Sequence, residues 1–454
     1  MLPKLAHDRG VRSNQLAQPR KGERHIRRVK TAIWVYIILL IFEGALRKWV
    51  APSLSTPLLV VRDPVAAYMI FEAFRLRILP ASPIFFGSIL LAVIAIPTAV
   101  FFGHGNPYLA LYGARPFLLH LPAMFVMALV LSRTDLIKIG KFLLFVSLGM
   151  TVLITLQFYS PQSAFINRSV GGAEGGGFSG AMGYLRPPGT FSFTSGTGQF
   201  YSLLAPFVLY FWLNPSGVNT LLRLAATLAL LLALPISISR GLVFQVTLTL
   251  AFAGLAAMAK PKLLIRAIAA ALVLVLAVGA LSSFDFFQTA IQVFLSRFNT
   301  ATQSEGGMEG VLIDRYFGGL FHAFSNVDSF TLWGMGIGLG TNVGAFLTTG
   351  QAQFLVAENE WQRLIGEMGV ILGIFAIAMR LAVTISATWK SINRLLRNDT
   401  LPWLLLSVAL TTFPQGNWAQ PTSLGFSIFG MALLLSSLRK ARPQSSINDL
   451  CKKF

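Results

Sequence analysis

The sequence predicts an all-α integral membrane protein with about twelve transmembrane helices and a large structured external loop late in the chain. The 454 residues are 54% hydrophobic and 12% charged, with a mean hydropathy of +0.66, whereas a soluble domain carries about a quarter charged residues. Apolar runs of about twenty residues, the length of a membrane-crossing helix, recur along most of the chain. Lys and Arg residues also gather on one side of these runs.

The apolar runs define the predicted organisation. Spans are expected at 31–49, 58–74, 84–102, 117–132, 142–159, 196–213, 220–238, 241–259, 263–281, 364–388, 401–418 and 422–438. The chain therefore divides into a basic tail (1–30), nine spans with an external loop at 160–195 (31–281), a large periplasmic loop (282–363), three spans (364–438) and a second tail (439–454). Loops as long as the two external ones are usually functional.

The distribution of basic residues orients the spans. Positive charge concentrates in cytoplasmic loops, and most of the 37 Lys and Arg residues fall on one side when both tails are placed in the cytoplasm. Arg380 falls within a span. The basic residues left on the external side are nearly all arginine: Arg47, Lys48, Arg62, Arg115, Arg168, Arg186, Arg240, Arg297, Arg315 and Arg363.

Composition also excludes several classes of function. A net charge of +20 would suggest nucleic acid binding in a soluble protein, but topology explains this charge, so no nucleic acid partner is expected. The lone Cys451 excludes a disulfide framework and a thiolate metal site. No histidine pair at metal spacing and no aspartate dyad stands out on the external side, so neither metal nor cofactor is expected.

Two external arginines lie where the local sequence restrains them. Arg186 precedes a Pro-Pro-Gly turn, and Arg240 lies in the short Ser-Ile-Ser-Arg-Gly turn between two spans. A guanidinium binds phosphate through a two-pronged fork that an ammonium lacks, so both are candidates for binding an anionic substrate. The alternatives are an interfacial anchor for Arg186 and an ion pair of Arg240 with Glu43 or Asp63.

The large loop holds further candidates. Apolar spacing at 311–325 predicts an amphipathic helix whose polar face carries Arg315 and His322; His322 is equally explained as a packed side chain. The alternating glycines at 334–340 predict a tight irregular segment rather than a dinucleotide site, since no βαβ unit surrounds them. Glu358 and Glu360, which precede a span, suit either a general base or a helix cap.

The polar end of the first span is a second candidate region. Glu43, Arg47 and Arg62 are expected either to line an external cavity or to anchor the span at the interface, together with Trp49.

Three motifs resemble one known family. RPPGTF at 186–191 resembles the R-x-x-G-T-F segment of O-antigen ligases and polymerases, and SISRG at 237–241 resembles their S-x-S-R-G turn. GMGIG at 334–338, followed by ENEWQRLIGEMG at 358–369, resembles their G-x-G-x-G and H-N-x-x-L-x-x-x-x-E-x-G region. The resemblance covers about residues 140–390, and the order of the motifs and the predicted topology agree with it.

The resemblance implies a membrane glycosyltransferase of the GT-C type at the outer face of the bacterial inner membrane. Such enzymes pass a glycan from an undecaprenyl-pyrophosphate carrier to an acceptor glycan hydroxyl without a metal. Arg186, Arg240 and Arg315 would bind the pyrophosphate, Arg240, Arg315 and Glu358 would be catalytic, and Arg363, Arg47, Arg62 and His322 are secondary candidates. Expected partners are the lipid-linked oligosaccharide donor, the acceptor glycan, membrane lipids and a chain-length regulator.

One departure from the family narrows the expected function. The ligases have a histidine where this chain has Glu358, which favours a polymerase of exopolysaccharide or O-antigen repeats, with Glu358 as the replacement base. An O-antigen ligase and a transporter or flippase of a lipid-linked anionic sugar stay open as alternatives. A flippase would need charged residues deep in the spans, and Arg380 is one of few such residues.

Overall fold

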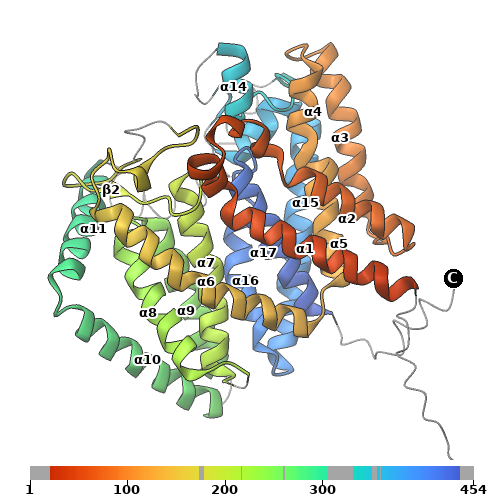
Figure 1. Cartoon of the computed structure of the whole chain (residues 1–454). Helices are drawn as coiled ribbons and strands as arrows, with labels where there is room; N and C mark the ends of the chain where they lie inside the picture. The colour runs from red at the N-terminus through yellow and green to blue at the C-terminus, as the bar shows by residue number, and fades with distance from the viewer. Residues whose placement is uncertain are drawn as a thin grey trace, which may run out of the picture.

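The computed structural model of the chain is a bundle of helices (Figure 1). It describes residues 21–172, 178–215, 217–258, 261–304, 331–349, 355–357 and 359–439. Within these ranges, eight helices are long and apolar enough to cross a membrane, and shorter apolar helices cover 220–236 and 400–412. The predicted class, an all-α protein of multi-pass membrane type, agrees with this architecture. The count of twelve crossings stays a prediction.

Short segments join most of the consecutive helices, and a longer one, 160–193, joins α6 to α7. In chain order they are α1 (Lys21–Ala45), α2 (Asp63–Arg75), α3 (Pro83–Phe101), α4 (Pro107–Arg115), α5 (Leu121–Val130), α6 (Arg133–Tyr159), α7 (Thr194–Leu213), α8 (Thr220–Ile236), α9 (Arg240–Met258), α10 (Pro261–Leu281), α11 (Asp285–Ser304), α14 (Asn342–Thr349), α15 (Glu360–Leu396), α16 (Thr400–Thr412) and α17 (Pro421–Leu438). The short turns are η1 (Leu46–Val50), η2 (Pro52–Leu54), η3 (Pro57–Val60), η4 (Pro116–His120) and η5 (Phe165–Asn167). Strands β1 (Phe178–Ser179) and β2 (Leu185–Arg186) form an antiparallel hairpin.

Capping residues explain where several helices begin. Ser132 and Asp135 form a reciprocal capping box at the start of α6, which satisfies two backbone N–H groups that would otherwise lack partners. Asn106 and Asn219 accept hydrogen bonds from the first-turn amides of α4 and α8. Proline stands in the first turn of α2, α3, α4 and α17, where it costs no helical hydrogen bond.

Some predicted spans differ from the helices that form. The predicted span 58–74 contains η3 and then α2, which has only 13 residues and is not among the eight long helices. The predicted span 117–132 belongs to a longer run, Pro107–Val130, in which α4, η4 and α5 are continuous. Helix α15 is 37 residues long and breaks at Gly369, where φ is 75°. Since Gly369 has φ in the region that favours glycine, it permits the kink.

Helix α17 lies at the centre of the bundle and α10 at its margin (Figure 1). In α17, 83% of the apolar window is buried inside the protein, whereas none of the α10 window is. The apolar side chains of α10 therefore face outward, which suits lipid contact rather than packing.

Ion pairs and turns mark the two ends of the bundle. At one end Lys30 pairs with Asp135 at 2.6 Å, and Arg133 pairs with Asp399 at 2.7 Å. At the other end lie η1, the β1–β2 hairpin, the turn between α8 and α9, and the start of α17. We call this second end the hairpin end; the described candidates Arg47, Arg186 and Arg240 lie on these elements.

The alternating glycines pack against the kink in α15. The amides of Met335 and Gly336 donate to the carbonyl oxygens of Gly366 and Glu367, each at 2.8 Å, and so satisfy carbonyls near the break in the helix. A Cβ on Gly338 would lie 2.5 Å from the Leu109 carbonyl oxygen, so only glycine fits there. The predicted tight irregular segment is confirmed, and its glycines serve close backbone packing.

Candidate functional site

The end of α1 carries two cations into the protein interior. Helix α1 continues into η1, a π-helical turn that contains Arg47 and Lys48. These two residues are 7% and 1% exposed, respectively. π-helical turns are rare and occur frequently at functional sites. Arg62, just before α2, is 2% exposed and meets α1 at Glu43. We call Glu43, Arg47, Lys48 and Arg62 the basic cluster.

The basic cluster has more positive than negative charge. The Glu43 carboxylate lies 3.2 Å from Arg62 Nε and 3.4 Å from Arg47 Nη1. Lys48 Nζ donates to the Gly189 carbonyl oxygen at 2.6 Å, and no described carboxylate pairs with it. The hydrogen bonds of the neighbouring Asp63 carboxylate go to Arg115 and His120, which are outside the cluster. Two buried guanidiniums and a buried lysine amine thus share one carboxylate, and an excess of buried positive charge is costly unless an anion joins it.

Asp63 is held by Arg115 and His120. Arg115 Nη1 lies 2.8 Å from one carboxylate oxygen, and His120 Nε2 lies 2.9 Å from the other. In the sequence, Glu43 and Asp63 are the carboxylates suggested as ion-pair partners of Arg240. Both carboxylates instead bind cations from the first third of the chain.

The loop that follows the hairpin is fastened to α1 and α6. Gln157, on α6, accepts from the Gly189 amide at 2.7 Å and donates to the Gly189 carbonyl at 3.2 Å. Arg47 Nη1 donates to Ser192 Oγ at 3.0 Å. A Cβ on Gly44 would lie 2.4 Å from the Ser192 amide nitrogen, so the loop lies directly on the α1 backbone. This anchoring fixes the turn that begins at Arg186.

Arg186 and Arg240 lie on elements that touch. Arg186 belongs to β2, in register with Phe178 of β1. Arg240 is the first residue of α9, and the preceding turn contains buried Ile238. A Cβ on Gly180 would lie 2.7 Å from Ile238 Cδ1, so the hairpin contacts this turn. The structure therefore brings together the hairpin, the α8–α9 turn and, through the Gly189 loop, the basic cluster.

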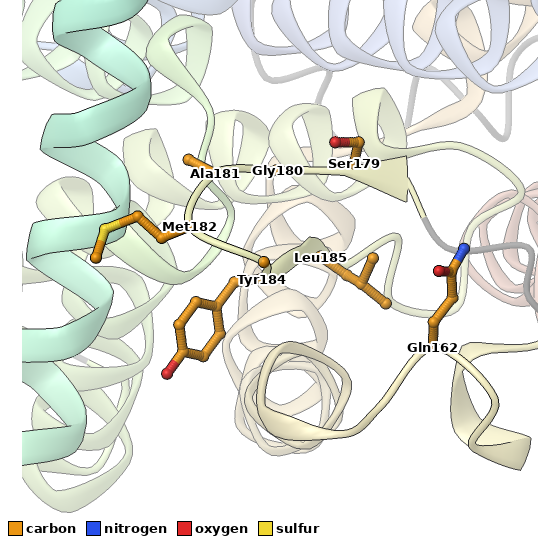
Figure 2. Close-up of a pocket in the computed structure, with 8 residues that line it drawn as sticks. Gln162, Ser179, Gly180, Ala181, Met182, Tyr184 and Leu185 are labelled. Carbon is orange, nitrogen blue, oxygen red and sulfur yellow. The ribbon is translucent and has the colours of Figure 1, made fainter.

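A cavity of about 460 Å³ lies on the hairpin itself. Figure 2 shows its lining around the turn that joins β1 to β2, next in sequence to Arg186. The Tyr184 ring, one of its walls, stacks on Phe158 with ring centroids 4.7 Å apart. The lining residues are Gln162, Ser179, Gly180, Ala181, Met182, Gly183, Tyr184 and Leu185.

Arg363 has a different environment from the basic cluster. Its guanidinium lies 3.0 Å from Glu360 and 2.6 Å from Glu367, and Arg380 lies 2.7 Å from Glu360. Two cations therefore meet two carboxylates, and this buried set is neutral. Asn359 caps α15 by accepting from the Trp361 amide at 3.0 Å. All four side chains belong to α15, on both sides of its kink, so the geometry gives Arg363 and Glu360 a structural role within this helix.

Several predicted residues lie outside the described part of the chain. They are Arg315, His322 and Glu358, together with the predicted amphipathic helix 311–325. Their assignment to the site stays a prediction. In the described ranges, no group of three or more His, Cys, Asp or Glu residues could hold a metal ion.

Sequence reasoning did not single out Lys48 or Gln157. Both contact Gly189, which lies 141 and 32 residues away in the chain. One signal for Lys48 was present, because it is a lysine among external basic residues that are nearly all arginine. Gln157 carried no such signal within its apolar span.

Comparisons with protein-family models, with curated proteins and with solved structures gave no match.

Proposed function

We propose that this chain is a membrane glycosyltransferase that polymerises glycan repeat units carried on undecaprenyl pyrophosphate. The observation that carries the proposal is the buried excess of positive charge in the basic cluster, held by one loop to the elements that bear Arg186 and Arg240. An excess of buried cations suits a polyanionic ligand such as a lipid diphosphate. The proposed enzyme works at the outer face of the bacterial inner membrane, with twelve spans and both termini in the cytoplasm.

The proposed reaction is an inverting transfer that needs no metal. An acceptor sugar hydroxyl attacks the anomeric carbon of the donor, a new glycosidic C–O bond forms, and the C–O bond to the pyrophosphate breaks. The pyrophosphate leaves with the bonding electron pair, and the hydroxyl proton passes to a base, for which we propose Glu358. Arg186, Arg240 and Arg315 stabilise the leaving group, because preorganised donors act where negative charge develops.

Deletion of the gene from cells that make the polysaccharide tests this function. We expect single-repeat lipid-linked glycan to accumulate at the outer face while long chains disappear, because polymerisation alone stops. Long chains stranded on the carrier would instead indicate a ligase, and repeats retained at the cytoplasmic face would indicate a flippase. Either of these two results would overturn the polymerase proposal.

Replacement of Lys48 by methionine should separate the anion-binding role from stability. Lys48→Met removes a buried amine that has no described carboxylate partner and that is costly to charge, so the detergent-solubilised protein should become more heat-stable. Pyrophosphate binding, measured by calorimetry at low salt, should weaken roughly tenfold, because one charge at about 10 Å contributes about 1.7 kcal/mol at an effective dielectric constant of about 20.

The matched control is Lys390→Met, which removes an exposed lysine at the opposite end of the bundle. It should leave pyrophosphate affinity unchanged. Equal affinities for the Lys48→Met variant and the unaltered protein would show that the basic cluster does not serve anion binding.

A further inference from the structure

Neutral polar side chains face one another where α7 and α17 begin. Ser195 Oγ, in the first turn of α7, donates to Gln420 Oε1 at 3.3 Å. One turn further along α7, Gln199 Nε2 donates to Ser423 Oγ at 2.8 Å. We call Ser195, Gln199, Gln420 and Ser423 the amide cluster. None of its members is charged, in contrast to the basic cluster.

The amide cluster contains an unsatisfied acceptor. Gln199 Oε1 is buried and has no hydrogen-bond partner in the part of the chain that the structure describes. Exchanging the amide oxygen and nitrogen does not remove the problem, because the nitrogen would then lack an acceptor. An unsatisfied buried polar atom costs about 1–3 kcal/mol. Gln199 Oε1 can therefore accept a hydrogen bond from a bound group.

The amide cluster lies between the two sets of cations. The carbonyl of Pro421, next to Gln420, accepts from Arg62 Nη2 of the basic cluster at 2.5 Å. On the other side, a Cβ on Gly198 would lie 3.5 Å from Ser239 Oγ, in the turn that precedes Arg240. A ligand held by Arg240 and the basic cluster would thus have neutral hydrogen-bonding groups beside it.

The polar contact is confined to the hairpin end. Phe191, just before α7, packs on Phe426 of α17 with ring centroids 5.6 Å apart. Further along the same pair of helices, a Cβ on Gly430 would lie 3.9 Å from a Leu203 methyl group. The α7–α17 contact is therefore polar at the hairpin end and apolar further along the helix pair.

We propose that the amide cluster binds sugar hydroxyl groups of the lipid-linked glycan, next to its diphosphate. A sugar hydroxyl both donates and accepts hydrogen bonds, so it can satisfy Gln199 Oε1 and also accept from a neighbouring side chain. Neutral amides suit an uncharged sugar, whereas arginines suit the diphosphate. This inference rests on the proposed function, because it assigns the sugar part of the same substrate.

The test uses the full-length protein in lipid nanodiscs and two separate probes. One probe is the lipid-free oligosaccharide repeat, obtained by hydrolysing the polysaccharide that the source cells secrete, and the other is inorganic pyrophosphate. We expect Gln199→Leu to weaken oligosaccharide binding at least fivefold, because a buried hydrogen bond is lost, and to leave pyrophosphate binding unchanged. Arg240→Ala should show the opposite pattern.

A matched control and a stability measurement keep the result interpretable. Gln292→Leu changes an exposed glutamine on α11 and should affect neither probe. Heat stability of Gln199→Leu should be close to that of the unaltered protein, since the variant removes an unsatisfied oxygen and, with it, the hydrogen bond to Ser423.

Two outcomes would overturn the inference. The first is that the unaltered protein does not bind the oligosaccharide, which would mean that only a water molecule occupies the position beside Gln199. The second is that the Gln199→Leu variant binds the oligosaccharide as well as the unaltered protein does. A third outcome separates the two proposals. If oligosaccharide binding depends on Gln199 but deletion of the gene leaves polymer length normal, the sugar site is supported and the polymerase function is rejected.

Discussion

Replacement of Arg240 by lysine is expected to reduce polymer formation by about 10²–10³-fold, although the positive charge is kept. The loss of one preorganised donor to developing charge typically has this effect. A lysine presents a point charge and cannot reproduce the two-pronged contact of a guanidinium with a phosphate. Arg240 begins α9 directly after a turn that packs on the hairpin. The backbone therefore cannot readily shift to bring the shorter lysine side chain to the phosphate.

The measurement is the initial rate of chain growth from purified lipid-linked repeats in detergent. Arg397→Lys, an exposed change at the opposite end of the bundle, should leave that rate unchanged. Arg186→Ala and Arg240→Ala should both fail to restore polymer to deletion cells. Near-normal polymer from cells carrying either alanine variant would refute the pyrophosphate-binding role.

Sequence patterns predicted most of the helices because hydrophobic length is a local property. Eight helices are apolar and long enough to span, and each overlaps a run that hydropathy identified. At 58–74 the apolar residues are divided between η3 and the short helix α2, which is not among these eight. Proline at 57 and at 64 interrupts this stretch, and sequence hydropathy does not register such interruptions.

The candidate site was predicted in part, and the missing part has a physical cause. Arg186 and Arg240 could be found because each lies in a short polar turn with its own signature. The contact between Arg62 and Pro421 joins residues 359 apart in the chain. Likewise, Gln199 is notable only because Ser423 and an unsatisfied oxygen lie beside it. Such features follow from packing of distant segments and have no local sequence signal.

Arg380 shows how a charge within a span can be structural. Besides Glu360, its guanidinium binds the carbonyl oxygens of Phe413 and Gly416 at 2.9 and 2.8 Å, and it lies 3.9 Å from the Trp418 ring centroid. These contacts join α15 to the segment between α16 and α17. Because the neighbouring carboxylate neutralises it, Arg380 offers little support for a charged path through the bundle, which a flippase would need.

Replacement of Arg380 by methionine is accordingly expected to destabilise the fold strongly. Arg363 alone would then face both Glu360 and Glu367, which leaves one buried negative charge in excess. Removing one partner from a buried ion pair costs about 3–5 kcal/mol, so the half-life of the detergent-solubilised protein on heating should fall sharply. Since membrane proteins often unfold irreversibly, this half-life is the appropriate measure.

The double change Arg380→Met with Glu360→Gln separates lost charge balance from lost packing. It removes one cation and one carboxylate together, so the remaining pair of Arg363 and Glu367 is neutral. We expect the double variant to recover a large part of the stability lost in Arg380→Met. Size-exclusion chromatography after a series of heating times measures both variants. If Arg380→Met withstands heating as well as the unaltered protein, the buried charge network does not hold α15 in place.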